Sequence, residues 1–218
     1  MASISEISPL IQENVRKSVG MSSNDLNGLS SAELDTIVTL LKAGPSRAKY
    51  RVGGYYGAEG PIDTLLMTED QLIVVPIVVE RFIVVEEIGV DVTTAGTEGD
   101  LYIALYADRG DSYPGASIHI SAAKAVTTTF KSTTGLDIEL PPGLYWAGAV
   151  VNQVTTTVAT LRSVLNSYGC VGLAAGTDDT NSCGYAEAAV TGAPNATFTS
   201  TVTVVGEGPR VLFKVKQA

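Results

Sequence analysis

One run constrains the fold of this chain more than any other: residues 136–151 read Leu-Asp-Ile-Glu-Leu-Pro-Pro-Gly-Leu-Tyr-Trp-Ala-Gly-Ala-Val-Val. Apolar side chains at 136, 138 and 140 alternate with carboxylates at 137 and 139, which is the period of a half-buried strand. Pro141, Pro142 and Gly143 cannot continue that strand, because proline lacks the N–H that a β-ladder needs and glycine favours a turn. The apolar residues 144–151 then begin a new strand. Together the two strands predict the buried core of a β-sandwich.

A similar strand-and-turn unit lies at 101–115. Two sets of side chains alternate along its first part: Leu101, Ile103 and Leu105 on one face, and Tyr102, Ala104 and Tyr106 on the other. Residues 108–115 are rich in Asp and Gly and contain Pro114, which is typical of a loop. The pattern therefore predicts a strand over 101–107 and a loop over 108–115.

The chain from residue 72 onward is also strand-like, with Val and Thr abundant. Turn residues separate further expected strands at 72–79, 82–92, 117–120, 125–131, 136–140, 144–151, 157–164, 198–204 and 211–215. Pro76 indicates an edge or a bulge in the first of these, and 93–99 and 206–209 are predicted turns. Many short strands joined by turns favour a mainly β fold, a jelly-roll or Greek-key-like sandwich.

Residues 1–50 differ in pattern and predict a short α-helical segment. Its clearest helix has Ser30 as N-cap and Glu33 completing a capping box, and Gly44-Pro45 ends it. The helix carries one apolar stripe at helical spacing: Leu34, Ile37, Val38 and Leu41. Short helices are marginal alone, so this stripe must dock elsewhere. We expect an attachment or assembly segment over 1–50 that leads into a sandwich over 51–218. Docking on the chain's own sandwich is the alternative.

Composition excludes several classes of function. The 218 residues are 45% hydrophobic and 17% charged, as in a folded protein whose surface is partly covered by other subunits. The net charge is −9 and the basic residues are scattered, so a nucleic-acid partner is not expected. No apolar run reaches the ~20 residues of a membrane span, and no secretory signal is visible at the N-terminus.

Catalytic groupings are not recognisable in the sequence. His119 is the single histidine and sits in the strand-like context Ser-Ile-His-Ile-Ser. The adjacent pairs Glu86-Glu87 and Asp178-Asp179 are expected to point to opposite faces of an extended chain. Neither a nucleophile elbow nor a phosphate-binding loop is present. The sequence therefore predicts a protein that is not an enzyme and needs no cofactor.

The 108–115 loop is the candidate ligand site. Asp108, Asp111 and Tyr113 gather there, and the two carboxylates are candidates to share a calcium ion with backbone carbonyls. Arg109-Gly110-Asp111 reads more simply as a polar hairpin turn, so no metal site is assigned. Nearby Trp146 lies in an apolar strand, which favours core packing over an exposed sugar platform.

Both cysteines lie within the Gly-rich residues 166–185. Cys170 and Cys183 are consistent with two separate thiols or with a disulfide that closes this loop, and both interpretations stay open. A zinc site is not favoured, because the single histidine is distant in sequence. A loop of this length in a compact domain is usually functional or part of an interface.

Four motifs together resemble one known family. They are Tyr55-Tyr-Gly-Ala-Glu-Gly60, Tyr106-Ala-Asp-Arg-Gly-Asp-Ser-Tyr-Pro-Gly115, Leu140-Pro-Pro-Gly-Leu-Tyr-Trp146 and Gly208-Pro-Arg-Val-Leu-Phe213. In this order they are similar to β-sandwich domains of tail and fibre proteins of tailed bacteriophages and related particles. The resemblance runs from about Tyr50 to the C-terminus and supplies no catalytic motif.

The resemblance implies a virion structural protein. A fibre, spike or capsid decoration subunit would be assembled in the host bacterial cytoplasm and located in the virion, anchored by its N-terminal segment. The partners it implies are other copies of the chain, as a homotrimer, together with capsid or tail proteins and a host-surface glycan. The alternative is a lectin-like carbohydrate-binding module, which predicts an exposed aromatic platform and a functional monomer.

Overall fold

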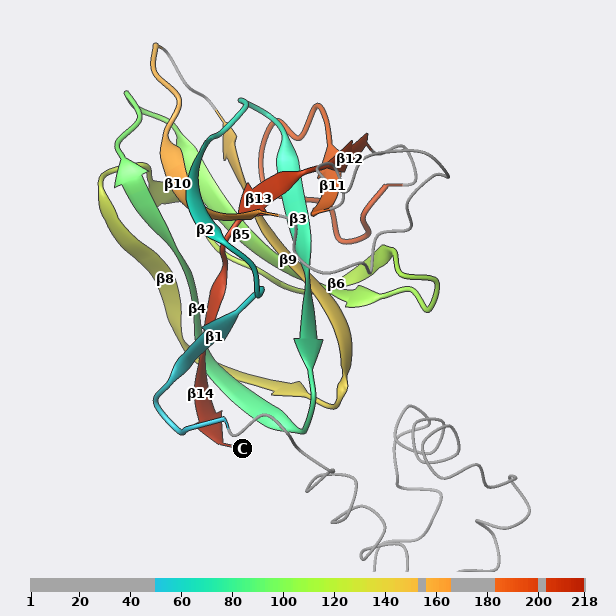
Figure 1. Cartoon of the computed structure of the whole chain (residues 1–218). Coiled ribbons are helices and arrows are strands. Elements are labelled where there is room, and N and C mark those ends of the chain that lie inside the picture. Colours follow the sequence, from blue (N-terminus) through green and yellow to red (C-terminus); the bar gives the residue numbers. More distant parts are fainter. Residues whose placement is uncertain (1–49, 153–155, 166–182, 200–202, 218) are drawn as a thin grey trace, which may run out of the picture. The chain divides into compact units, whose positions relative to one another are not determined.

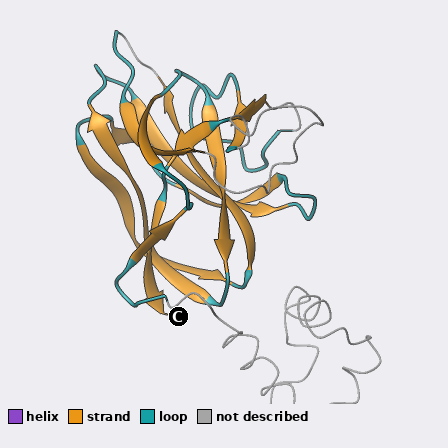
Figure 2. Ribbon diagram, viewed as in Figure 1, coloured by secondary structure: helices purple, strands orange, loops and turns teal. Residues whose placement is uncertain are grey.

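Two antiparallel β-sheets packed together form the fold (Figures 1 and 2). The structure is a computed structural model, and it describes residues 50–152, 156–165, 183–199 and 203–217. These ranges contain strands, turns and loops. The expected mainly β architecture of two packed sheets is therefore confirmed. The predicted helices within residues 1–49 lie outside the described residues.

The first sheet, called sheet A, is built around the long strand β4. Along one side β4 pairs with β8, and along the other it pairs with β14 and β10. β1 pairs with β14, while β2 and β13 both pair with β10. The strands of sheet A are β1 (Tyr55–Gly57), β2 (Ile62–Leu66), β4 (Ile83–Thr94), β8 (Thr129–Leu140), β10 (Thr160–Leu165), β13 (Glu207–Pro209) and β14 (Leu212–Gln217).

The second sheet, sheet B, has the order β12-β11-β3-β9-β5-β6, with β7 beside the start of β5. Its strands are β3 (Leu72–Val79), β5 (Asp100–Asp108), β6 (Pro114–Ile120), β7 (Lys124–Ala125), β9 (Gly143–Asn152), β11 (Gly184–Glu187) and β12 (Thr203–Val205). On β3, the described ladder to β11 consists of Leu72, Ile73 and Val74. Pro76 lies beyond that ladder, so the missing N–H interrupts no hydrogen bond to β11.

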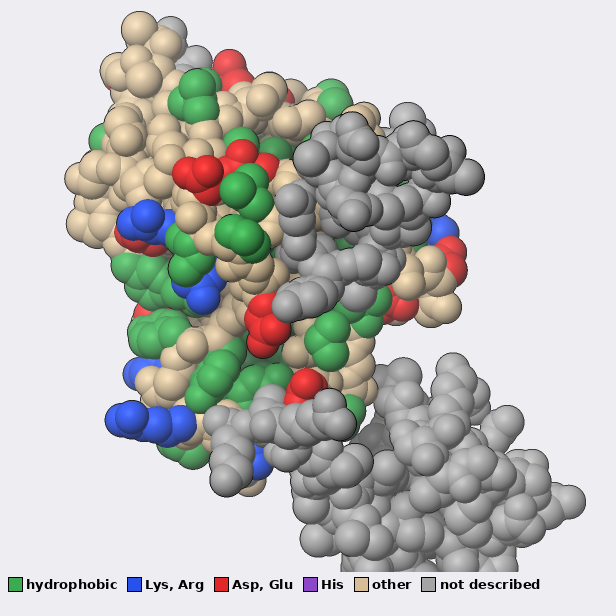
Figure 3. All heavy atoms as spheres, viewed as in Figure 1, with side chains coloured by type: hydrophobic (Ala, Val, Ile, Leu, Met, Phe, Trp, Pro, Cys, Tyr) green, Lys and Arg blue, Asp and Glu red, His purple; other side chains and the backbone are tan. Residues whose placement is uncertain are grey.

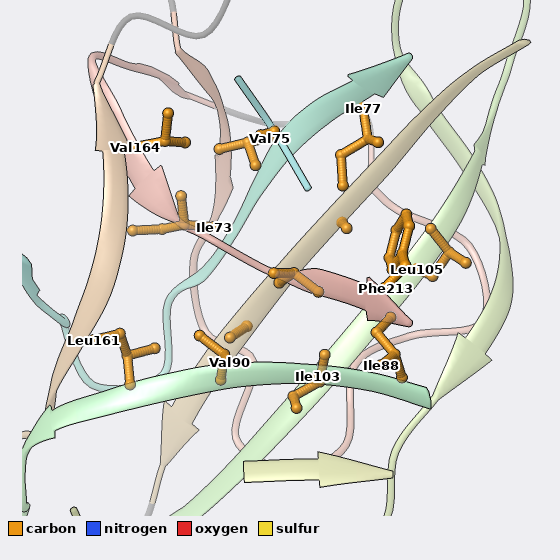
Figure 4. Close-up of a cluster of buried hydrophobic side chains, with 14 of the residues drawn as sticks. Ile73, Val75, Ile77, Ile88, Val90, Ile103, Leu105, Leu161, Val164 and Phe213 are labelled. Atoms are coloured by element: carbon orange, nitrogen blue, oxygen red, sulfur yellow. The ribbon is translucent and has the colours of Figure 1, made fainter. Parts of the chain in front are cut away.

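The main core lies between the sheets (Figure 4). Leu101, Ile103 and Leu105 are fully buried there, as their alternation predicted. Phe213 from sheet A packs into the same core with 1% exposure. Burying a side chain of this size stabilises a fold by about 1.5–3 kcal/mol, so this layer supplies much of the stability.

A second hydrophobic cluster covers the opposite, outer face of sheet B. Its buried members include Leu72, Val74, Ala104, Tyr106, Trp146, Val150, Tyr185, Val190 and Phe198. Residues 188–199, called the strap, contribute Val190 and Phe198 to this cluster. The amide of Asn152 donates to the carbonyls of Val190 and Gly192, both at 2.8 Å, and so fixes the strap to β9. The part of sheet B beneath this cluster is therefore buried on both faces.

Several expected boundaries are wrong. The segments 125–131 and 136–140 were expected as two strands, but β8 is one strand of twelve residues, Thr129–Leu140. Gly135 takes a φ of 73° within it, and residues 135–137 of β8 bulge opposite Glu86 of β4, so the ladder continues on both sides of what reads as a turn. The turn expected at 206–209 contains the short strand β13.

Two further strands of sheet A were not expected. No strand was predicted over residues 46–60, yet Tyr55–Gly57 pairs with β14 as β1. β2 was missed because Ile62-Asp-Thr-Leu-Leu66 is short and lacks a clean alternation. Of the strand expected at 198–204, the described residues show β12 from Thr203 to Val205, while Phe198 packs on the outer face of sheet B.

Candidate functional site

The loop between β5 and β6 brings the predicted site residues together. Asp108 ends β5, and its Oδ2 accepts a hydrogen bond from the Gly110 N–H at 2.7 Å. The Arg109 N–H donates to the Tyr113 carbonyl at 2.8 Å and closes the turn. Gly110 has a φ of 101°, in the region that favours glycine. Local backbone geometry thus places Asp108, Asp111 and Tyr113 within one tight loop.

Arg109 and Asp111 form an ion pair inside this loop. Nη2 of Arg109 lies 2.6 Å from Oδ2 of Asp111, and both side chains are about half exposed. The hydrogen bond from Arg109 lowers the pKa of Asp111. The tripeptide Arg-Gly-Asp therefore folds back on itself, as expected of a polar hairpin turn.

Tyr113 is held by two protein groups. The Arg109 guanidinium lies over its ring, 5.0 Å from the centroid. The ring of Tyr185 stacks on it at 4.3 Å between centroids with a 32° tilt. Tyr185 comes from β11, far from the loop in sequence. The aromatic side chain that a sugar would use in this loop is thus already engaged.

The contacts continue down to sheet B. The Tyr185 ring lies 5.2 Å from the ring of Trp146, whose Nε1 donates to Oδ1 of Asp108 at 2.9 Å. Burial, followed by the charges of nearby Tyr113 and Asp111, raises the pKa of Tyr185. A connected set results, called the loop brace: Asp108, Arg109, Asp111, Tyr113, Trp146 and Tyr185. It ties an exposed loop to a fully buried tryptophan.

The loop brace gives the calcium alternative no support. Both oxygens of Asp108 accept hydrogen bonds from protein groups, and the carboxylate of Asp111 faces a guanidinium. A cation would have to displace these donors. In the described ranges, no three His, Cys, Asp or Glu side chains gather as a metal site requires. A ligand-binding role for Asp108, Asp111 and Tyr113 stays a prediction.

His119 lies on β6, opposite Leu105 of β5, and is half-buried. Burial, and then the charge of Lys124, lowers its pKa. Its Nε2 is buried without a hydrogen-bond partner. This is the packed sheet histidine that its sequence context predicted.

The expectation that Glu86 and Glu87 point to opposite faces is wrong. Val85 and Ile88 both lie in the core, and Glu86 is an extra residue of β4 relative to its partner β14. This bulge places Glu86 and Glu87 outside the core. Glu86 pairs with Lys214 at 2.9 Å, and Glu87 accepts from Tyr55. Asp178 and Asp179 lie outside the described residues.

Sequence reasoning missed an aromatic pair on the outer face of sheet A. Tyr55 is 44% exposed and Phe130 is 36% exposed, and their rings meet edge to face at 5.5 Å. The Tyr55 hydroxyl donates to Oε2 of the buried Glu87 at 2.7 Å, which raises the pKa of Tyr55. The Phe130 ring lies over Gly89, where a Cβ would come within 2.5 Å of Cζ. The glycine was the available signal, since an aromatic ring often covers such a gap.

Two further predictions concern positions only partly covered by the structure. Cys183 is buried, and its Sγ donates to the Val164 carbonyl at 3.2 Å. Cys170 and the assembly stripe Leu34, Ile37, Val38 and Leu41 lie outside the described residues. Both the cysteine pairing and the role of the stripe stay predictions.

Comparison with known proteins assigns no family. No protein-family model matches the chain, and no curated protein matches it. Where the structure is described, no helix is long and apolar enough to cross a membrane. The resemblance to phage tail and fibre domains therefore stays a prediction from the motifs.

Proposed function

We propose that this chain is a non-enzymatic structural protein of the virion of a tailed phage or phage-like particle. It would serve as a fibre, spike or capsid decoration subunit, anchored by residues 1–50, with the two-sheet body projecting for assembly or adhesion. A homotrimer in contact with capsid or tail proteins is part of this proposal. So is a jelly-roll or Greek-key connection of the strands, which the crossings from β3 to β4, β4 to β5 and β8 to β9 support.

The loop brace is the observation that carries this proposal. In the β5–β6 loop, Arg109 pairs with Asp111, and Asp108 accepts a hydrogen bond from the buried Trp146. Such bonding makes a projecting loop rigid and engages the groups that substrate chemistry would need. Rigidity of exposed loops suits a particle subunit that must keep its shape outside the cell.

The proposal is tested by the native mass of the full chain. Ile37→Asp with Leu41→Asp places charges on the predicted assembly stripe. An oligomer that becomes a monomer in this variant, with unchanged strand content by circular dichroism, supports N-terminal assembly. A wild-type chain that stays monomeric at all concentrations and does not bind isolated particles counts against it.

A lectin-like module is the second candidate, and the exposed Tyr55–Phe130 pair favours it. Sugars stack their C–H faces on exposed aromatic rings and bond their hydroxyls to nearby charged groups. Here Glu87 and Lys214 flank the rings. A glycan array with wild type and Tyr55→Ala tests this. Binding that is lost in the variant supports a lectin, and the absence of any binding by wild type contradicts it.

A further inference from the structure

Strand β2 forms an open edge of sheet A. In the described residues it pairs with β10 and with no other strand. Its Ile62 is 55% exposed and its Leu66 is 63% exposed. Hydrophobic side chains reach the surface over β1 and β2 (Figure 3). Natural edge strands are usually protected by charged side chains, lysine above all, or by proline; β2 has no lysine or proline within its bounds, and Asp63 is its one charged residue.

Hydrogen bonds show which backbone groups of β2 face outward. Leu165 N–H donates to the Pro61 carbonyl at 2.9 Å, and Met67 N–H donates to the Ala159 carbonyl at 3.1 Å. Because bonding sides alternate along an antiparallel strand, odd-numbered residues of β2 bond to β10 and even-numbered residues face away. Thr64 agrees, since its N–H donates to a side chain, Oδ1 of Asp63, at 2.8 Å. The outward groups therefore belong to Ile62, Thr64 and Leu66.

We propose that two copies of this chain pair through their β2 strands, antiparallel and centred on Thr64. In this register Ile62 faces the partner subunit's Leu66, and Thr64 faces its own counterpart. Two of the three residues with outward backbone groups, Ile62 and Leu66, are thus also the exposed apolar residues of β2. The two strands complete each other's ladder and extend sheet A across both copies.

Self-complementarity argues for a second copy as the occupant. A two-fold contact requires one surface to match itself, and the sequence Ile-Asp-Thr-Leu-Leu has apolar ends about a polar centre. Asp63 faces the partner subunit's Leu65 in this register, so the two carboxylates are not directly opposed. This contact would join subunits independently of the N-terminal stripe.

Asp63 regulates the pairing in this proposal. Its carboxylate occupies the Thr64 N–H, which is the donor at the centre of the two-fold contact. Pairing requires this side chain to turn away. Removal of the carboxylate is therefore expected to strengthen association, whereas charges at Ile62 and Leu66 weaken it.

Sedimentation equilibrium of the full chain over a wide range of concentration tests the proposal. Ile62→Lys with Leu66→Lys is expected to weaken the concentration-dependent step about tenfold or more. Asp63→Ala is expected to strengthen it about fivefold. Val78→Lys is the matched control, because Val78 is 58% exposed but belongs to sheet B. Circular dichroism checks that each variant keeps its fold.

Three outcomes overturn the pairing. They are a wild-type mass that does not depend on concentration, an equal loss in the Val78→Lys control, and unchanged association in both β2 variants. An oligomer lost through Ile37→Asp and Leu41→Asp but unaffected by the β2 variants would leave the proposed function standing and refute this contact. Both β2 residues are exposed, so the lysines are not expected to prevent folding.

Discussion

The outer faces of the two sheets differ in how far other residues cover them. On sheet B the strap covers the face, and Phe198 is only 5% exposed. On sheet A the corresponding aromatic, Phe130, is 36% exposed, and the β2 edge presents Ile62 and Leu66 to solvent. A β-sandwich needs to bury only one face of each sheet. Sheet B thus has additional stabilising contacts, and sheet A has surface available to a partner.

The two phenylalanines give the largest expected contrast. Phe198→Ala removes a buried ring under the strap and should lower the free energy of unfolding by about 3–5 kcal/mol. Phe130→Ala removes a partly exposed ring and should cost about 1 kcal/mol. Urea denaturation of both variants measures the difference. Equal losses would mean that the strap does not close sheet B.

The next largest effect is expected at alkaline pH, where the buried Tyr145 of sheet B should lower the free energy of unfolding. Burial raises the pKa of Tyr145, on β9, to about 12. The unfolded chain releases this proton near pH 10, so stability is complete below about pH 10 and falls by roughly 2–3 kcal/mol as pH rises to about 12. Denaturation midpoints against pH measure the fall. Tyr145→Phe should reduce the slope, and an unchanged slope would contradict the assignment.

A smaller loss is expected from the polar contacts that hold the strap. Glu187 is 3% exposed, and its Oε1 accepts from the Asn195 amide at 3.0 Å. Glu187→Ala leaves that contact unmade beside the buried Tyr106 hydroxyl, which donates to the Asn195 carbonyl. The expected cost is about 1–3 kcal/mol, with faster proteolysis within 188–199. Wild-type resistance of this segment in the variant would show that Glu187 does not hold it.

Arg109→Ala should have the smallest effect on stability. The ion pair with Asp111 is solvent-exposed, and such pairs contribute little. The melting temperature should stay within experimental error, while Trp146 fluorescence should be unchanged because its bond to Asp108 remains. A large drop in melting temperature would mean that the loop brace contributes more to the stability of the fold than an exposed ion pair normally does.

Period-2 patterns predicted the core but not the edges. Leu101, Ile103 and Leu105 face the core between the sheets, as expected. A strand that packs against a second sheet must present apolar side chains at every other position. β2 could not be predicted, because an edge strand has little burial to impose an alternation. The faces of Glu86 and Glu87 were predicted wrongly because a bulge in β4, which depends on its pairing with β14, changes the period locally.

The candidate site was predictable only where it is local. Asp108, Asp111 and Tyr113 are neighbours in sequence, so their meeting in one loop follows from the turn residues between them. Trp146 is 38 residues from Asp108, and their hydrogen bond depends on the pairing of β5 with β9. Long-range partners of this kind have no signature in a local pattern.

Amide hydrogen exchange of the full chain at low and high concentration tests the central contrast most directly. Protection of the β2 amides of Ile62, Thr64 and Leu66 should rise with concentration, while the amides of β9 should stay equally protected throughout. That result would identify the sheet A edge as the surface that meets a partner. Exchange in β2 that is independent of concentration, or already as slow as in the covered sheet, would contradict it.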